Sequence, residues 1–315
     1  MNGKRAFILL AGLGAALLAM PASAAEPESC HAPRIADGGW TDNAAQNGLL
    51  TNVLKGLGYE PKVDLLSVPV ILTSLKSKDI DIWLDNWMPS QTAELEPYTK
   101  DGSVESIGVN LDGAGYGPVV PTYVVDAGVR DLKDLAANAD KFDRKMYGIE
   151  PGNDGNRILQ QNIDDPANGL AGWKLVESSE QGMLAQVARA VKRNEPIVFL
   201  GWEPHPMNAN FEMAYLSGGD DWFGPDFGGA TVFTNVRKGY AGECANVGTL
   251  LKNLKFSLKL ENEIMGAILD QAKEPDAAAA AWLKQNPDVL DGWLAGVTTV
   301  DGGEGLAAVR KSLGL

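Results

Sequence analysis

The chain has 315 residues, 45% of them hydrophobic, and carries 27 basic against 41 acidic residues, a formal net charge of −14. Its length allows a large buried core, and its mixed composition does not suggest disorder. The acidic balance argues against binding to nucleic acid or anionic lipid, which need basic patches, and is compatible with a cationic ligand.

The first 24 residues have the three parts of a secretory signal peptide. Lys4 and Arg5 form a basic start, an apolar run follows, and an Ala-x-Ala site ends at Ala24. The apolar run is shorter than the roughly 20 residues that a membrane span needs. We therefore expect cleavage after Ala24 and export of the mature chain, most simply to a bacterial periplasm, without membrane insertion.

Cys30 and Cys244 are the two cysteines of the chain. In an oxidising compartment, we expect one disulfide that joins the mature N-terminus to the later part of the chain. The alternative is a catalytic thiol. It has little support, because His31 is only a neighbour in sequence and no other dyad is evident.

The first part of the mature chain alternates short strands with amphipathic helices. The expected strands lie near 30–36, 62–66, 79–85 and 106–111, and the expected helices cover about 43–57, 69–76 and a segment from 90. Asp42 could be the N-cap of the first helix, and Pro89 would end pairing of the third strand.

The glycine-dense segment 112–118 is interpreted as a crossing between two lobes, followed by a strand at 119–125. Further helices are expected at 132–141, from the turn 151–155 through 161, at 180–193 and from 245 to the end. Strands are expected near 145–149, 197–202, 211–216 and 231–237, with a loop at 218–229. This alternation predicts an α/β fold with mainly parallel sheets. Two crossings predict that lobe II, residues 114–216, is inserted into lobe I, residues 25–113 and 217–315.

Four short apolar runs are each followed by a break and an aromatic residue, namely Trp40, Trp87, Tyr116 and Trp202. In open α/β sheets, ligands bind beyond the carboxyl ends of strands, so we expect these aromatics to converge on one cation. A quaternary ammonium group is held by aromatic faces, each worth roughly 0.5–2 kcal/mol. The alternative for any one of them is ordinary core packing.

Three polar residues are further candidates. Asp42 could place a carboxylate near the cation, and Asn153 could bond a ligand hydroxyl, although each also suits a helix cap or turn. His205 could bind a carboxylate if protonated, but we favour a structural role in its proline-rich loop.

Enzymatic interpretations have little support. The sequence contains no Gly-x-Ser-x-Gly elbow, P-loop or His-Glu-x-x-His motif, so we expect no catalytic residue, metal or cofactor. A hydrolase with paired carboxylates stays open.

The motifs at 35–42, 81–89, 115–117 and 201–205 resemble those of substrate-binding proteins of ABC importers in the glycine betaine/choline group, and the resemblance covers essentially the whole mature chain. It implies a type II periplasmic-binding-protein fold with two hinge crossings, a ligand cleft between the lobes, and an ABC permease in the inner membrane as partner. We expect the protein itself to be a monomer. It implies an aromatic box and ligand contacts at Trp40, Trp87, Tyr116, Trp202, Asp42 and Asn153. In the choline-binding branch it also implies a disulfide at Cys30 and Cys244.

The choice between choline and glycine betaine depends on charge. Betaine carries a carboxylate, which needs N–H donors, and the box motifs contain no basic residue except His205. Asp42 would repel that carboxylate, so we expect choline as the ligand and acetylcholine as a weaker one. A binding protein for glycine betaine or proline betaine, a secreted choline-ester hydrolase and a chemoreceptor-linked sensor are the alternatives.

Overall fold

The computed structural model describes residues 26–315. The expected signal peptide lies outside this part of the chain. Among the described residues, no helix is long and apolar enough to cross a membrane.

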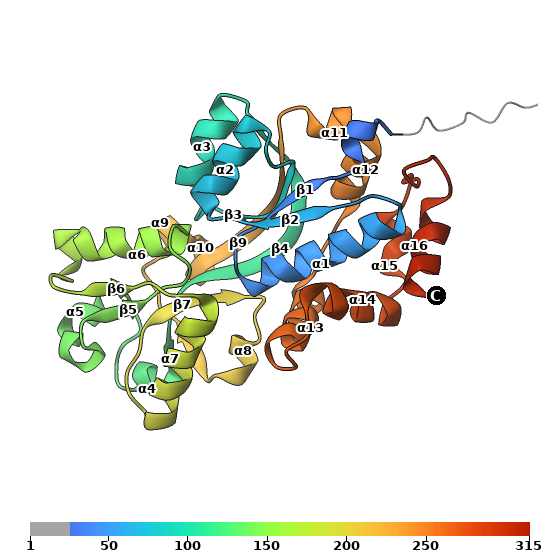
Figure 1. Ribbon diagram of the computed structural model, residues 1–315. Helices are drawn as coiled ribbons and strands as arrows, with labels where there is room; N and C mark the ends of the chain where they lie inside the picture. The colour runs from blue at the N-terminus through green and yellow to red at the C-terminus, as the bar shows by residue number, and fades with distance from the viewer. Residues whose placement is uncertain (1–25) are drawn as a thin grey trace, which may run out of the picture.

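Within residues 26–315 the strands form one nine-stranded sheet in the order β2-β1-β3-β9-β4-β7-β5-β6, with β8 paired to β4 (Figure 1). The strands are β1 Arg34–Asp37, β2 Lys62–Leu65, β3 Ile82–Met88, β4 Val104–Pro121, β5 Lys145–Tyr147, β6 Lys174–Val176, β7 Phe199–Glu203, β8 Met213–Tyr215 and β9 Gly229–Arg237. The outer strands pair in parallel at both ends of this order, β1 with β2 and β3, and β5 with β6 and β7.

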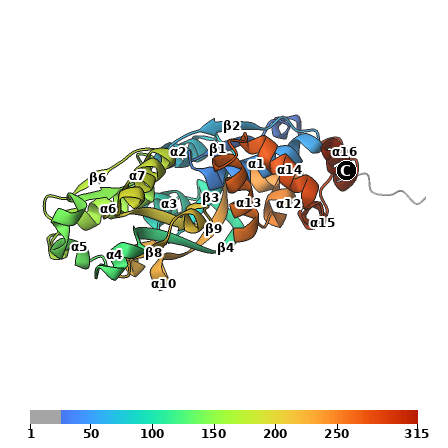
Figure 2. The ribbon, with the colours of Figure 1, turned by 90° about the horizontal axis from the view of Figure 1, so that it is seen from below.

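Two strands connect the ends of the sheet. The first part of β4 pairs antiparallel with β9, and its last part pairs antiparallel with β7 and β8. β9 also pairs antiparallel with β3. The molecule is therefore elongated, with a lobe at each end and β4 and β9 running between them (Figure 2). The expectation of mainly parallel sheets is wrong at these two strands.

The segment interpreted as the first crossing lies inside a strand. Residues 112–118 belong to the 18-residue strand β4, so the strand does not first resume at residue 119. Gly113 has a φ of +74° and lies where the pairing register with β9 shifts, between Leu111 and Ala114, so it marks a β-bulge. Gly115 and Gly117 remain paired with neighbouring strands. The expected strand at 119–125 ends at Pro121, because proline has no N–H for further pairing, and helix α4 begins at Thr122.

Helices cover both lobes. Those of the first lobe are α1 Thr41–Gly56, α2 Val68–Ser77, α3 Thr92–Lys100, α11 Tyr240–Glu243, α12 Ala245–Asn253, α13 Leu258–Leu269, α14 Pro275–Gln285, α15 Val289–Trp293 and α16 Gly305–Leu313. Those beyond the crossing are α4 Thr122–Asp126, α5 Asp134–Ala137, α6 Asp154–Asp164, α7 Glu180–Arg193 and α8 Met207–Asn210. The short helices α9 Asp220–Phe223 and α10 Pro225–Gly228 lie just before β9 in the chain. The C-terminal region is helical as predicted, and its helices α13, α14 and α16 pack against α1.

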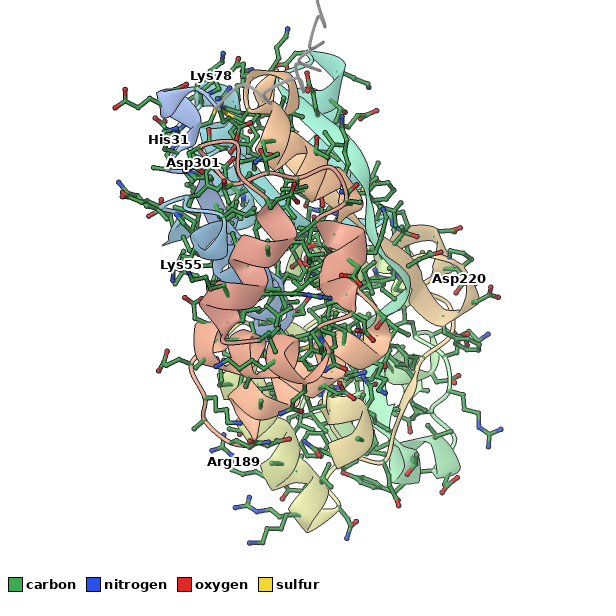
Figure 3. All side chains as sticks on the ribbon, turned by 90° about the vertical axis from the view of Figure 1, so that its right-hand side faces the viewer. His31, Lys55, Lys78, Arg189, Asp220 and Asp301 are labelled. Atoms are coloured by element: carbon green, nitrogen blue, oxygen red, sulfur yellow. A yellow bond between two sulfur atoms is a disulfide. The ribbon has the colours of Figure 1, made fainter. Side chains whose placement is uncertain are left out.

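The expected disulfide is confirmed. Cys30 and Cys244 are bonded, with 5.6 Å between their Cα atoms. The bond joins the 3₁₀ turn Glu28–Cys30 to the junction between α11 and α12. Figure 3 shows it at the end of the molecule near His31, opposite the end that carries Arg189.

Candidate ligand-binding site

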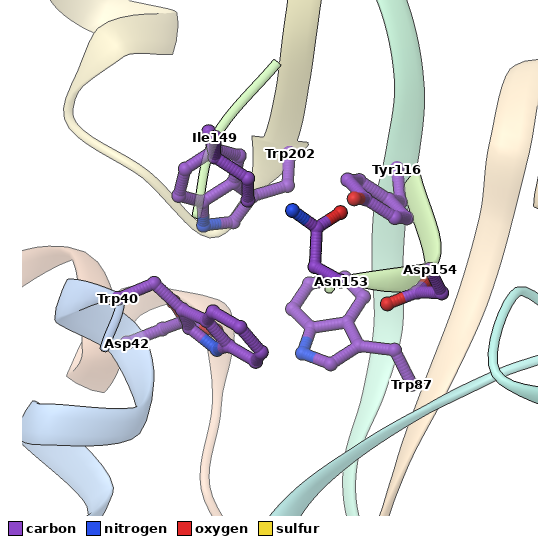
Figure 4. Close-up of a pocket in the computed structure, with 8 residues that line it drawn as sticks. All are labelled: Trp40, Asp42, Trp87, Tyr116, Ile149, Asn153, Asp154 and Trp202. Atoms are coloured by element: carbon purple, nitrogen blue, oxygen red, sulfur yellow. The ribbon is translucent and has the colours of Figure 1, made fainter. Parts of the chain in front are cut away.

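All six residues predicted as ligand contacts line one cavity, whose empty space is about 280 Å³ when the part open to solvent is included (Figure 4). The lining consists of Trp40, Asp42, Trp87, Tyr116, Ile149, Asn153, Asp154 and Trp202. They come from the start of α1, from β3, β4 and β7, and from the start of α6 and the residues just before it. Both lobes therefore contribute walls to the cavity.

Sheet pairing explains how the aromatic rings meet. Trp87 and Trp202 are each the penultimate residue of a strand, close to the predicted position at a strand end. Tyr116 lies inside β4 rather than after a strand, and is paired directly with Trp202, so the two side chains share one face of the sheet. The rings of Trp87 and Tyr116 are 5.8 Å apart between centroids at 56°. All four aromatic side chains are buried.

Two glycines allow the rings to take these positions. A Cβ on Gly38 would lie 2.6 Å from the ring of Trp40, and a Cβ on Gly155 would lie 1.9 Å from the hydroxyl of Tyr116. Either contact would force the aromatic side chain to move, because real Cβ atoms do not approach so closely. Glycine is therefore needed at both positions for its small size.

Asp85 connects two walls of the cavity. It is fully buried on β3, and its two carboxylate oxygens accept the indole N–H groups of Trp40 and Trp87, the latter at 2.8 Å. Burial raises the pKa of Asp85 to about 7, although both indole donors lower it. Gln46 also donates to this carboxylate at 3.4 Å and to Glu261 at 3.0 Å.

Asp42 presents a carboxylate to the cavity. It is fully buried, and neither oxygen has a hydrogen-bond partner within residues 26–315. Burial, together with the nearby carboxyls of Asp85, Glu261 and Glu180, raises the pKa of Asp42 well above its usual range. The alternative role of Asp42 as N-cap is wrong, because α1 begins at Thr41 and Trp40 occupies the cap position. A cationic ligand would satisfy this carboxylate directly.

Asn153 and Asp154 form the start of α6. The Asn153 side-chain oxygen accepts the backbone N–H of Asn156 at 2.8 Å, so Asn153 caps the helix as well as lining the cavity. Asp154 accepts from Gln91 at 3.1 Å, while its other oxygen has no partner in the described part of the chain. Burial raises the pKa of Asp154 to about 6.

His205 lies outside the cavity lining. The backbone N–H of Met207 donates to its Nδ1 at 2.8 Å, so the other nitrogen carries the proton and donates to Glu180 at 2.9 Å. Glu180 also accepts the backbone N–H of Thr41 at 2.7 Å and the Thr41 hydroxyl. His205 therefore has the structural role that we favoured, in a contact between the starts of α7 and α1.

The cavity has no positive counterpart for its carboxylates. None of the eight lining residues is basic, and Arg157 on α6 instead binds Glu94 and the carbonyl of Ser90 at 2.9 Å. Within residues 26–315 no cluster of three or more His, Cys, Asp or Glu side chains could hold a metal ion.

The sequence analysis missed three residues of this region. Ile149 is the last residue of the expected strand 145–149, Asp154 directly follows Asn153, and Asp85 stands two residues before Trp87. A carboxylate inside the apolar run that leads to Trp87 was the available signal for Asp85.

Similar proteins bind quaternary ammonium compounds. Residues 34–285 match the family model for the substrate binding domain of ABC-type glycine betaine transport systems. The chain is 58% identical to an ABC-transporter choline binding protein solved in complex with choline, with a TM-score of 0.90 over 91% of this chain and 100% of that one. An unliganded semi-closed form of such a protein has the same identity and coverage and a TM-score of 0.84. Lactococcal OpuAC, closed around glycine betaine, is 28% identical, with a TM-score of 0.74 over 83% of this chain and 98% of that one.

Proposed function

Because the chain belongs to the family of substrate-binding domains of ABC-type glycine betaine transport systems, we propose that it captures choline and delivers it to an ABC importer. One observation supports choline as the ligand rather than glycine betaine. Four aromatic side chains surround a cavity whose buried Asp42 carboxylate has no partner among the described residues, and no lining residue is basic. Aromatic faces and a negative charge suit a cation that cannot donate a conventional hydrogen bond.

The choline hydroxyl is expected to meet the polar side of the cavity. Asp42 would accept the hydroxyl proton, and the amide of Asn153 would contact the hydroxyl while it also caps α6. A betaine carboxylate would face Asp42 and Asp154 without a basic partner in the lining, which disfavours it. Acetylcholine keeps the same headgroup and is proposed as a weaker ligand.

Ligand capture would close the two lobes. We assign lobe I to residues 25–113 and 217–315 and lobe II to residues 114–216, with β4 and β9 as the crossings. A ligand that contacts Trp40 and Trp87 from one lobe and Tyr116 and Trp202 from the other has its full set of contacts only when the lobes are together. It therefore shifts the equilibrium toward the closed form, which would dock on the permease.

The remaining proposals concern the setting of the protein. We propose that it is exported by a signal peptide cleaved after Ala24, acts in the periplasm as a monomer that does not insert into the membrane, and returns its ligand unchanged. The family consists of substrate-binding domains, which supports a binding role rather than catalysis.

A titration followed by analysis of the ligand tests this function. Three indoles line the cavity, so choline should change the tryptophan fluorescence of the mature protein saturably with one site per chain. NMR of the released ligand should then recover both choline and acetylcholine intact. Appearance of acetate from acetylcholine would instead support a hydrolase, and no response to choline would contradict the proposed function.

A further inference from the structure

We propose that Asp85 is a positioning residue, which fixes the rings of Trp40 and Trp87 for the cation by accepting both indole N–H groups with one carboxylate. The inference rests on the proposed function, because the box must bind a cation for the positioning to matter. Asp85 itself is not among the eight residues that line the cavity, so it would act through the two rings.

The geometry makes Asp85 a bridge between two elements. Trp40 directly precedes α1 and Trp87 lies near the end of β3, so no local backbone pairing fixes one ring relative to the other. One Asp85 oxygen accepts from Trp40 and the other from Trp87 at 2.8 Å. Fixing each N–H removes the remaining rotational freedom of the ring, and the ring faces are then held where a ligand needs them.

The same bond also acts on the electrostatics of the rings. A carboxylate that accepts an indole N–H polarises the ring, which makes its face more attractive to a cation. In its ionised form, Asp85 thus adds negative charge behind two of the four aromatic walls without itself lining the cavity. Trp202 provides an internal comparison, because its indole N–H is buried and has no partner in residues 26–315.

Packing alone does not account for this carboxylate. Asp85 is fully buried and shares its surroundings with Asp37, Asp42, Asp154 and Glu261, all acidic. Gln46 is its one further side-chain donor within the described chain. A buried charge without a basic partner is destabilising, and a neutral side chain of similar size would serve packing better. The two indole bonds give a functional reason for the charge.

Replacement of Asp85 by Asn tests the proposal. Asn has the same size and can accept one indole N–H, but it presents an NH₂ group to the other and carries no charge. We expect Asp85→Asn to weaken choline binding at least tenfold by calorimetry, to alter the near-ultraviolet circular dichroism of the unliganded protein, and not to lower its melting temperature. A merely structural Asp85 would instead lower the melting temperature and leave the affinity within twofold, which would overturn the proposal.

Glu261→Gln is the matched control for charge. Glu261 is equally buried and bonded to Gln46, but within residues 26–315 it accepts no indole N–H. We expect this variant to reduce choline affinity less than threefold and to leave the near-ultraviolet spectrum unchanged. An equal loss of affinity in Glu261→Gln and Asp85→Asn would mean that charge alone matters, and would overturn the positioning role.

A second pair of variants tests the proposal even if Asp85→Asn does not fold. Trp87→Phe removes an N–H that Asp85 accepts, whereas Trp202→Phe removes an N–H without a partner, and both keep an aromatic ring. We expect Trp87→Phe to lose at least threefold more choline affinity than Trp202→Phe, and equal losses would contradict the proposal. If the unmodified protein fails to bind choline, the proposed function fails, while the unliganded spectra of Trp87→Phe and Trp202→Phe still report whether the Asp85 bond orders the ring.

Discussion

Replacement of the single residue Asp42 should affect choline affinity and folding stability in different directions. Its buried carboxylate has no partner among the described residues and lies near other acids, so the charge opposes folding in the absence of a cation. We predict that Asp42→Asn lowers choline affinity about tenfold or more, and that the melting temperature of the unliganded protein stays equal or rises. Calorimetry and thermal unfolding measure the two effects. Intact affinity with a lower melting temperature would assign Asp42 to folding alone.

The sequence predicted individual cavity residues better than it predicted their connections. Trp40, Trp87 and Trp202 follow apolar runs at places where the chain leaves a strand or enters a helix, and such places meet at one edge of a sheet. The role of Asp85 depends on the ring of Trp40 arriving from another element. No local pattern contains that information. The double role of Asn153 as cap and cavity wall likewise needs the position of the neighbouring strands.

The starts of α1 and α7 form a contact beside the cavity that should favour closure. Thr41 donates its hydroxyl to the buried carboxylate of Glu180 at 2.8 Å, in addition to its backbone N–H. We predict that Thr41→Ala shifts the equilibrium toward the open form by about 1.5 kcal/mol and weakens choline binding roughly tenfold. The reason is that the hydroxyl's hydrogen bond to the Glu180 carboxylate exists only in the closed form, so its removal destabilises that form alone. Calorimetry measures the affinity, and small-angle X-ray scattering should show a more open ensemble at low choline.

Thr51→Ala is the matched control for this contact. Thr51 lies in the same helix and is also buried, but its hydroxyl has no partner within residues 26–315. Its replacement should leave choline affinity within about twofold, since it loses no bond between elements. If both threonine variants weaken binding equally, the Thr41–Glu180 contact does not control closure.

Helices and strands were predictable where local signals agreed. α7 matches the predicted range 180–193, because an amphipathic pattern is bounded by Ser179, whose side chain caps the first turn, and by Asn194 in a left-handed conformation. The glycine-dense segment 112–118 was interpreted as a crossing that precedes a strand, because glycine usually marks turns. In the structure, β4 has partners on both edges, and this tertiary pairing outweighs the local preference of its glycines. The short helices α9 and α10 were predicted as a loop for the same reason.

The disulfide should stabilise the whole molecule without affecting the ligand site. Cys30 and Cys244 are 214 residues apart in sequence, and the elements that they join contribute no residue to the cavity. We predict that Cys30→Ala combined with Cys244→Ala lowers the free energy of unfolding by about 2–5 kcal/mol. Denaturant unfolding measures this loss. Choline affinity should remain within twofold, and a large loss of affinity in a folded variant would link the disulfide to the site.

The buried acids predict opposite pH trends for stability and affinity. Burial raises the pKa of Asp85 to about 7 and that of Asp154 to about 6, above the ordinary value in an unfolded chain. Between about pH 4 and pH 7 the folded protein therefore holds protons that the unfolded chain has released, so stability falls as pH rises. A bound cation favours the ionised carboxylates, so choline affinity should rise several-fold over about pH 5–7.

Thermal unfolding of the unliganded protein and calorimetry with choline, at constant ionic strength, measure these trends. Asp81 is ion-paired with Arg34 and Arg237, and these bonds lower its pKa. Its contribution to the pH dependence of stability therefore falls at a lower pH than the trend from Asp85 and Asp154. A melting temperature that rises between about pH 5 and pH 7 would contradict the assigned burial effects.

Paired calorimetric titrations of the mature protein with choline and with glycine betaine test the central claim most directly. The unpartnered carboxylate of Asp42 and the absence of a basic residue among the eight that line the cavity predict tight binding of choline and much weaker binding of betaine. Equal or tighter binding of betaine would be consistent with the aromatic box, because betaine also carries a quaternary ammonium group, but it would contradict the role of Asp42 in selectivity. Binding of neither compound would contradict the assignment of the cavity to a quaternary ammonium ligand.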